Sequence, residues 1–340
     1  MSSKYETLVI GAGGIGAVVA YGIHYTGKSN LGIVVRGHYD KLISEGYTID
    51  SVDYGKVDGW KPDYLYPSIE EAGKSGIEYD FVVVSTKNLP DIEKVEDLIE
   101  PVVTPSKTAV VLVQNGFDIG RPLIERFPQN IIISGVSHCG SHKYGTLVEH
   151  IQHDNAKISY FGNPNFEESA LEQKTKEFIS MYKNPKNDID YFPNERWYRY
   201  RKLVYNATLN TVCALTDVDT GRLQLWGGLD EISVPAMREI VAIAKADGCD
   251  LPSDVINIVG HGDDGVYFVP SMLDDVRKGN PIELEIILGN VLRVADQLAV
   301  DAPILKVLYA LLKLKQGRLK EKRGLLTVPE TRPPNTKYYS

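Results

Sequence analysis

The 340-residue chain has few cysteines and no long uninterrupted apolar segment. Its three cysteines are widely spaced, which excludes a disulfide framework and favours a reducing, cytoplasmic compartment. A membrane helix needs about 18 consecutive apolar residues, and the richest run, Ala302–Leu314, is interrupted by a proline and two lysines. The N-terminus reaches a predicted strand almost at once, so we expect neither a secretory signal nor a membrane span.

Positive charge is also scarce, because 37 lysines and arginines face 45 aspartates and glutamates, for a formal net charge of −8. Binding to nucleic acid needs a positive surface that neutralises phosphates, so we expect no nucleic-acid partner. A small anionic ligand needs only local positive charge and stays compatible with this composition. The length is typical of a chain with two domains.

The first half of the chain alternates short apolar runs with segments of helical periodicity. The runs are rich in β-branched residues and nearly continuous, as in parallel strands that are buried on both faces. They are Thr7–Ile10, Leu31–Val35, Phe81–Val84, Ala109–Val113 and Ile131–Gly135. The helical segments are Gly14–Thr26, Pro90–Ile99 and Ile119–Arg126. This alternation predicts an α/β fold with a Rossmann-type doubly wound parallel sheet. Two later runs, Thr146–Gln152 and Lys157–Phe161, are expected to extend this sheet.

From residue 194 onward the strand pattern disappears and only helical segments follow. They are Glu195–Leu215, Gly228–Ala246, Pro252–Val259, Ser271–Arg277, Ile282–Leu298 and Ile304–Gln316. We therefore predict a dinucleotide-binding Rossmann-like domain at 1–192 and an all-helical substrate and catalytic domain at 193–323. A polar, proline-rich segment at 324–340 is predicted to be a flexible tail.

A glycine-rich loop follows the first predicted strand and opens the first predicted helix. Residues 11–16, GAGGIG, fit the pattern G-x-G-x-x-G in the context that dinucleotide binding requires. Gly11 permits the tight turn, Gly13 lets the backbone approach a pyrophosphate, and Gly16 lets helix and strand pack closely. We predict a cofactor loop formed by Gly11, Gly13, Gly14 and Gly16; an ordinary glycine-rich turn is the alternative.

The end of the second predicted strand bears on the choice of cofactor. NAD sites carry an acidic residue about 20 residues beyond the glycines, and here Arg36 occupies that place. A guanidinium suits a 2′-phosphate, so we predict NADP(H). A solvated surface arginine is the alternative, and the nearby Asp40 could reverse the preference.

Two further loops follow predicted strands, at the edge where open α/β sheets bind ligands. Lys87 follows the strand at 81–84 and supplies positive charge, and Asn115 follows the strand at 109–113 and supplies an amide. Both are predicted to contribute to the cofactor site, and the Asn115 amide could instead orient a substrate. The alternatives are a surface lysine and a turn-forming Asn-Gly pair.

The first helix of the second domain carries a polar stripe. Lys202, Asn206 and Asn210 are spaced i, i+4, i+8 and so share one face of the predicted helix Glu195–Leu215. Their neighbours are mostly apolar, and burying such polar groups is costly unless they bind something. The stripe therefore predicts a binding or catalytic role, with a solvated polar face as the alternative.

The residue types of His138, Cys139, His142, His150 and His153 are compatible with metal binding. His150 and His153 would point to opposite faces of a strand, and no carboxylate lies at ligand spacing, so no metal site is predicted.

Taken in order, these motifs resemble the ketopantoate reductase (2-dehydropantoate 2-reductase) family over nearly the whole chain. The resemblance rests on residues 11–16, 35–37, 85–87, 114–116, 145–150, 159–162, 201–203, 206, 210, 270–273, 275, 277, 282–285, 289 and 302–303. It implies an NADPH-dependent reduction of a branched 2-oxo acid to a 2-hydroxy acid, in the pantothenate pathway.

The same resemblance assigns roles residue by residue. Lys202 matches the catalytic proton donor and Glu283 the acidic residue that binds the substrate hydroxyl. Asn206, Asn210 and Ser271 match substrate-binding positions. The cofactor matches are Lys87 and Asn115 near the nicotinamide ribose, and Arg36 at the 2′-phosphate.

Two other functions stay open at this stage. The family often has Asp and Asn where this chain has Glu285 and Leu288, which suits a related 2-oxo acid reductase or D-2-hydroxy acid dehydrogenase with another substrate. A non-catalytic NADPH-sensing protein is the third hypothesis, although a sensor has no need of a proton donor. A homodimer is compatible with the sequence but not indicated by it.

Overall fold

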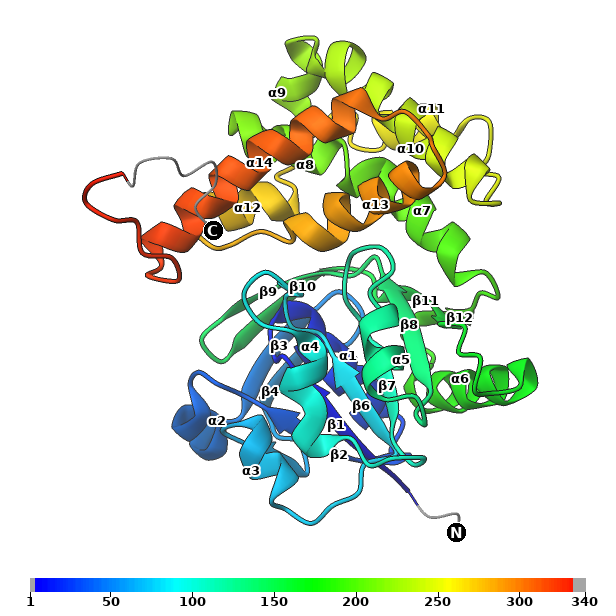
Figure 1. Ribbon diagram of the computed structural model, residues 1–340. Helices are drawn as coiled ribbons and strands as arrows, with labels where there is room; N and C mark the ends of the chain where they lie inside the picture. The colour runs from blue at the N-terminus through cyan, green and yellow to red at the C-terminus, as the bar shows by residue number, and fades with distance from the viewer. Residues whose placement is uncertain (1–3, 333–340) are drawn as a thin grey trace. The chain divides into compact units, whose positions relative to one another are not determined.

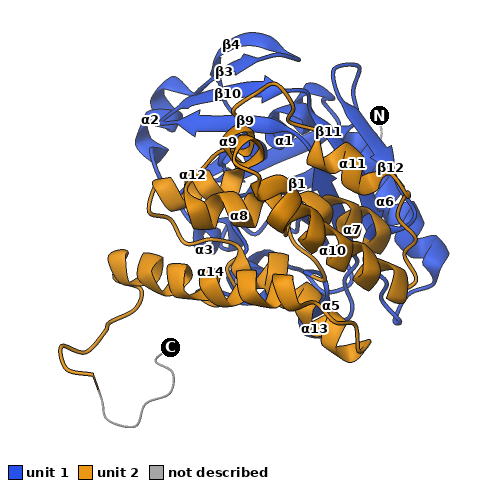
Figure 2. Ribbon diagram, turned by 90° about the horizontal axis from the view of Figure 1, so that it is seen from above, with its two compact units in different colours: residues 1–88, 93–114, 119–195 blue, residues 89–92, 115–118, 196–340 orange. Residues whose placement is uncertain are grey.

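A computed structural model describes residues 4–332, which form two compact units (Figure 1). Unit 1 contains residues 1–88, 93–114 and 119–195, and unit 2 contains residues 89–92, 115–118 and 196–340 (Figure 2). Two short segments from the first half of the chain therefore belong to unit 2. No helix of the described residues is both long enough and apolar enough to cross a membrane.

The main sheet of unit 1 has eight strands in the order β12-β11-β8-β7-β6-β1-β2-β5. Its strands are β1 (Tyr5–Ile10), β2 (Ser29–Val34), β5 (Tyr64–Tyr66), β6 (Phe81–Val84), β7 (Ala109–Leu112), β8 (Ile132–Ser137), β11 (Asn155–Tyr160) and β12 (Asp188–Tyr191). From β5 to β8 all neighbours are parallel, in the 3-2-1-4-5-6 order of a dinucleotide-binding sheet. The predicted Rossmann-type sheet is confirmed, and β11 extends it antiparallel to β8.

The strand register brings the carboxyl ends of the central strands to one edge. Ile10 lies beside Val34 on one side and beside Val84 on the other, and Val84 lies beside Leu112. The glycine loop and the segments that begin at residues 35, 85 and 113 therefore all leave the sheet at the same edge. This is the edge at which open α/β sheets bind their ligands.

A second, four-stranded sheet in unit 1 was not predicted. It has the order β4-β3-β10-β9 and contains β3 (Tyr47–Ser51), β4 (Gly55–Trp60), β9 (Gly140–Tyr144) and β10 (Leu147–Gln152). The prediction that the run at 146–152 extends the main sheet is wrong, because β10 pairs with β3 and β9 instead. The β9–β10 hairpin packs on the first helix, α1 (Gly14–Tyr25).

The remaining helices of unit 1 are α2 (Tyr39–Glu45), α3 (Ile69–Gly73), α4 (Val95–Ile99), the 3₁₀ turn η1 (Glu100–Val102), α5 (Arg121–Arg126) and α6 (Glu168–Tyr182). The helix predicted at 90–99 forms only over its second half. Residues 89–92 make a turn instead, closed by a hydrogen bond from the Ile92 N–H to the Leu89 carbonyl. The longest of these helices in unit 1, α6, was not predicted.

Unit 2 is helical, as predicted. Its elements are α7 (Glu195–Asn206), α8 (Leu209–Thr216), α9 (Thr220–Leu225), the π-helical turn η2 (Leu229–Ser233), α10 (Val234–Ala246), α11 (Val255–Gly260), α12 (Ser271–Arg277), the π-helical turn η3 (Glu285–Gly289), α13 (Asn290–Gln297) and α14 (Pro303–Lys322). The apolar helix α8 lies at the centre of this unit, packed against α12 and α14. Of the predicted flexible tail at 324–340, residues 333–340 lie outside the described part, and residues 324–332 form no helix or strand.

The single helix predicted at 195–215 is divided into α7 and α8. Thr208 leaves helical geometry, with φ −124° and ψ −80°. Its hydroxyl donates to the Val204 carbonyl four residues earlier, at 2.6 Å, a contact that often bends helices. The prediction that Lys202, Asn206 and Asn210 share one continuous helix is therefore wrong: the first two lie on α7 and Asn210 lies on α8.

Candidate active site

Three predicted site residues form one hydrogen-bonded chain in unit 2. The Lys202 ammonium donates to Asn115 Oδ1 at 2.9 Å, and Asn115 Nδ2 donates to Glu283 Oε2 at 3.3 Å. A cation and a carboxylate are thus held on the two ends of one amide. Such a group can donate a proton or hydrogen bond to a substrate oxygen at one end and accept one at the other.

These three side chains come from distant parts of the sequence. Lys202 lies on α7, Glu283 lies just before the π-helical turn η3, and Asn115 lies in the short segment 115–118 that belongs to unit 2. Glu283 is only 5% exposed. Because a buried carboxylate is costly unless it is hydrogen-bonded, the contact with Asn115 is part of what stabilises it there.

Asn206 lies one helical turn after Lys202, on the same face of α7. It is 8% exposed, and its side-chain amide makes no hydrogen bond within the described part of the chain. Its amide atoms are not completely buried, so they stay accessible to a ligand. An accessible amide one turn from Lys202 is compatible with the predicted substrate-binding role.

Asn210 and Ser271, two further predicted substrate residues, lie side by side. Asn210 Nδ2 donates to Ser271 Oγ at 3.5 Å, and Asn210 Oδ1 accepts from the Met272 N–H at 3.0 Å. The second bond satisfies an N–H in the first turn of α12, which no side chain of that helix caps. Asn210 therefore ties α8 to α12 and fixes Ser271 in place.

Glu285, one of the positions that departs from the family pattern, has structural partners of its own. It accepts from the Tyr309 hydroxyl at 2.6 Å and lies 3.5 Å from the Arg293 guanidinium. Burial, together with the Glu285 carboxylate, raises the pKa of Tyr309 above its usual value. The carboxylate of Glu285 therefore links η3 to α13 and α14.

The glycine loop of unit 1 has the geometry of an anion site. Gly11 has φ +99°, and a Cβ on Gly16 would collide with the Gly11 carbonyl oxygen and the Ser85 hydroxyl. Gly13 is the N-cap of α1, no side chain caps this helix, and a Cβ on Gly13 would meet no atom within 4 Å. Uncapped N–H groups beside free space can donate hydrogen bonds to a phosphate.

The two predicted cofactor cations of unit 1 are exposed. Arg36 lies 3.5 Å from Glu93, in an ion pair whose side chains are 69% and 55% exposed. Such a surface pair is weak, so little holds Arg36 away from a ligand. Lys87 follows β6 and is also exposed. The glycine loop, Arg36 and Lys87 thus lie in unit 1, whereas Asn115 belongs to unit 2 with the catalytic candidates.

Several residues that hold the segment 115–118 were missed by the sequence analysis, among them Arg199 and Asn290. Arg199 is 2% exposed and donates to the Gly116 carbonyl. Nothing in the spacing distinguishes it from Arg196 and Arg201, because its role depends on where Gly116 lies in three dimensions.

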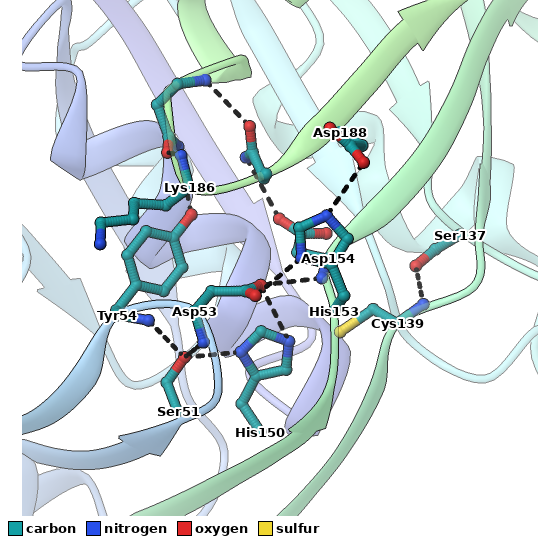
Figure 3. Close-up of polar contacts among 12 residues, drawn as sticks. Ser51, Asp53, Tyr54, Ser137, Cys139, His150, His153, Asp154, Lys186 and Asp188 are labelled. Atoms are coloured by element: carbon teal, nitrogen blue, oxygen red, sulfur yellow. Dashed lines mark hydrogen bonds and ion pairs between the residues drawn. The ribbon is translucent and has the colours of Figure 1, made fainter.

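A second polar cluster lies in unit 1 (Figure 3). Asp53 hydrogen-bonds to His153 Nδ1 at 2.7 Å, and its other carboxylate oxygen lies 3.6 Å from His150 Nε2. The prediction that these histidines point to opposite faces is wrong, because β10 has a register shift after His150 and ends before His153. Among the described residues, no group of three or more His, Cys, Asp or Glu side chains could hold a metal ion.

This cluster makes the stability of unit 1 depend on pH. The hydrogen bond that His153 donates to the Asp53 carboxylate raises the pKa of His153, and Asp188, 3.1 Å from its Nε2, adds to the shift. The resulting stabilisation is present below the unfolded pKa of about 6.5 and is lost as the pH rises through the folded pKa. We expect His153→Gln to lower the free energy of unfolding by about 0.5–1 kcal/mol near pH 6, a value reduced for solvent screening because His153 is nearly half exposed.

Urea unfolding at about pH 6 and about pH 9 measures this difference. His142→Gln is the control, because His142 is exposed and makes no ion pair within the described residues. An equal loss at both pH values for His153→Gln would show that its charge has no part in the stabilisation.

Comparison with known proteins places the chain in a family. Residues 7–163 match the profile described as Ketopantoate reductase PanE/ApbA, and residues 194–316 match the profile described as Ketopantoate reductase PanE/ApbA C terminal. The chain belongs to the ketopantoate reductase family. An uncharacterized protein of Saccharomyces cerevisiae is 37% identical over 347 residues, which cover 95% of this chain and 97% of the relative. The resemblance drawn from the motifs is confirmed.

Solved structures of the ketopantoate reductase fold agree with this assignment. The crystal structure of 2-dehydropantoate 2-reductase from Methylococcus capsulatus superimposes with a TM-score of 0.79 at 28% identity, covering 92% of this chain and 97% of the other. A ternary structure of D-mandelate dehydrogenase with NADH and anilino(oxo)acetate gives a TM-score of 0.75 at 19% identity, covering 93% and 99%. The second likeness concerns the fold alone. By family, this chain is a ketopantoate-reductase-like oxidoreductase.

Proposed function

We propose that this ketopantoate-reductase family member reduces a branched 2-oxo acid to the 2-hydroxy acid with NADPH, and that 2-dehydropantoate is its substrate. The observation that carries the proposal is the Lys202–Asn115–Glu283 chain, which joins a proton donor to a carboxylate acceptor. Pantothenate biosynthesis would then be the pathway that uses the product.

The residues of unit 1 suit a nicotinamide dinucleotide. The pyrophosphate would lie over Gly13 at the uncapped N-terminus of α1, where no side chain interferes. Arg36, and Lys87 at the end of β6, would add positive charge for the 2′-phosphate and for the ribose region. When bound, the reduced nicotinamide supplies the hydride.

The residues of unit 2 would handle the charge that develops on the substrate. As hydride reaches the ketone carbon, the carbonyl π electrons move to oxygen, and a cation beside that oxygen stabilises it. Lys202 would donate its proton to this oxygen, which completes the hydroxyl group and leaves a neutral amine that solvent reprotonates. Asn115 orients the ammonium, and Glu283 would accept a hydrogen bond from the new hydroxyl.

Asn206, Asn210 and Ser271 are proposed to bind the substrate. Asn206 lies one helical turn after Lys202 on the same face of α7, which is the strongest support among the three. Ser271 is held by Asn210, so Asn210 acts on the substrate largely through Ser271. A homodimer and a cytoplasmic location stay predictions from the sequence.

The activity is tested by following the absorbance of reduced nicotinamide with the purified protein. The substrates are 2-dehydropantoate, other branched 2-oxo acids and an aromatic 2-oxo acid, each with NADPH and with NADH. Preferred turnover of 2-dehydropantoate with NADPH is expected. Preference for another acid would retain the chemistry but assign a different substrate, as in a D-2-hydroxy acid dehydrogenase. Binding of NADPH without turnover of any acid would favour a sensor.

The cofactor preference gives a separate prediction for Arg36. We expect Arg36→Ala to lower the ratio of NADPH to NADH affinity by about 10–100-fold, since hydrogen bonds to charged groups contribute about 1.5–3 kcal/mol. Fluorescence titration with each cofactor measures the ratio. Glu93→Gln is the matched variant, and it should strengthen NADPH binding slightly because it removes the carboxylate that competes for Arg36. An unchanged ratio in Arg36→Ala would remove Arg36 from the cofactor site.

A further inference from the structure

We propose that Arg199 and Phe117 are positioning residues that fix Asn115 to the helical unit and thereby align Lys202 with Glu283. The proposal rests on the function proposed above, because that function requires Lys202 and Glu283 to be aligned on one substrate. The side chain of asparagine is short, so the position of its amide depends on where the backbone of residues 115–117 is held. Each step below concerns contacts within unit 2.

The backbone of this segment is bound at three successive polar groups. The Gly116 carbonyl accepts from Arg199 at 2.7 Å, and the Phe117 N–H donates to the Ile286 carbonyl at 2.7 Å. The Phe117 carbonyl accepts from Asn290 Nδ2 at 2.5 Å. Neither backbone group of Phe117 is left to solvent, so the segment cannot shift along its length without losing these bonds.

The side chain of Phe117 anchors the same segment. It is 1% exposed, and its ring centroid lies 4.3 Å from that of Tyr200. The Arg196 guanidinium also lies over the Phe117 ring, 4.6 Å from its centroid. Aromatic and cation–π contacts of this kind have defined geometry, so they fix orientation as well as depth.

Gly116 allows the close approach that these bonds need. Its φ of +104° is open to glycine but strained for other residues, and a Cβ would lie 2.6 Å from Ile286 Cβ. The chain therefore passes against η3 with no side chain between them.

The holding residues lie on the two elements that carry the catalytic candidates. Arg199 precedes Lys202 by three residues on α7, so the two cations point to one side of the helix and bind the consecutive residues Gly116 and Asn115. On the other side, Ile286 and Asn290 lie in the helical run that begins directly after Glu283. A π-helical turn at this place is typical of functional sites, where it redirects backbone groups. Both α7 and the stretch from Glu283 to Asn290 thus contact the backbone of residues 116–117 as well as the amide of Asn115.

The alternative is that Arg199 only stabilises the helical unit. It is a buried cation, and such a residue must have its donors satisfied whether or not it serves catalysis. The two roles differ in what they affect: misalignment of Lys202 changes the chemical step, whereas simple loss of stability lowers the unfolding temperature and the amount of active protein.

The test compares Arg199→Met with Arg201→Met, a matched arginine on the same helix with no hydrogen bond or ion pair in the described structure. For Arg199→Met we expect kcat to fall by about 10–100-fold, because a shift of about 1 Å in a catalytic group has this effect. The Kd for NADPH should change less than about twofold, and the alkaline limb of the kcat–pH profile should move. Arg199→Lys should recover part of the rate, and Arg201→Met should match the wild type.

A second measurement does not depend on turnover. Hydrogen–deuterium exchange of a peptide that covers residues 115–118 should be faster in Arg199→Met and unchanged in Arg201→Met, both at a temperature where the proteins are folded. If Arg199→Met does not fold, Phe117→Leu replaces it, since this change keeps the backbone donors and removes the ring contacts. Faster exchange with no 2-oxo acid activity in the wild type would retain the positioning role and reject the proposed function. Unchanged exchange, or an unchanged kcat and pH profile, would overturn the proposal.

Discussion

Lys202→Met is expected to lower kcat by about three orders of magnitude while the protein stays folded and binds NADPH with wild-type affinity. Removing a general acid alone typically costs about 10²–10⁴-fold, and the same substitution removes the cation that stabilises the developing alkoxide. Methionine keeps the length of the side chain and is tolerated on a partly buried helix. Single-turnover kinetics with NADPH and 2-dehydropantoate measures the chemical step directly.

Two variants distinguish the electrostatic effect of the Lys202 charge from the role of Lys202 as proton donor. Lys202→Arg keeps a cation that does not deprotonate near neutral pH, so we expect intermediate activity with no alkaline fall in kcat. Asn115→Ala keeps the ammonium but removes the amide oxygen that orients it, and should lower kcat less than Lys202→Met. Activity of Lys202→Met above about a tenth of wild type would mean that another group donates the proton.

The second large effect is expected in the glycine loop, where two conservative changes should fail in different ways. In Gly16→Ala, the new Cβ collides with the Gly11 carbonyl and the Ser85 hydroxyl. Because the carbonyl belongs to the backbone of a tight turn, relief requires the loop itself to move. We expect a loss of about 1–3 kcal/mol in stability, typical of overpacking, together with loss of cofactor binding.

In Gly13→Ala, by contrast, the added methyl meets no protein atom, and the extended φ of −73° and ψ of −168° suit alanine. The unfolding temperature should therefore be unchanged, while the Kd for NADPH rises about tenfold or more because the methyl occupies the path of the pyrophosphate. Thermal unfolding with and without NADPH distinguishes the two variants. Wild-type affinity in Gly13→Ala would show that no phosphate approaches the backbone at this residue.

The strands of the main sheet were predictable because buried parallel strands are apolar throughout. Phe81–Val84 and Ala109–Leu112 contain only apolar residues, whereas a surface helix or a loop would also contain polar ones. The four-stranded sheet escaped prediction for the opposite reason: Gly55–Trp60 contains two glycines and two charged residues, and its pairing with β3 is decided by tertiary contacts.

Residues of the candidate site were predictable where burial of a polar side chain costs free energy. A lysine and an asparagine among apolar neighbours indicated Lys202 and Asn206. The division of α7 from α8 was not predictable, because the residue at the break is a threonine rather than glycine or proline. Arg199 likewise resembles its neighbours in sequence, and only its contact with Gly116 distinguishes it.

The assignment of residues 115–118 to the helical unit has a consequence for how this protein can be divided. A fragment that starts at residue 196 contains Lys202 and Glu283 but lacks the amide that joins them, which lies 168 residues before Glu283 in the chain. A chimera that replaces residues 196–340 by the C-terminal part of a relative would likewise separate this chain's Asn115-Gly116-Phe117 segment from Arg199 and from η3. For recombination, the functional module is therefore not a continuous stretch of sequence, and an exchange that preserves it must transfer residues 115–118 together with the helices.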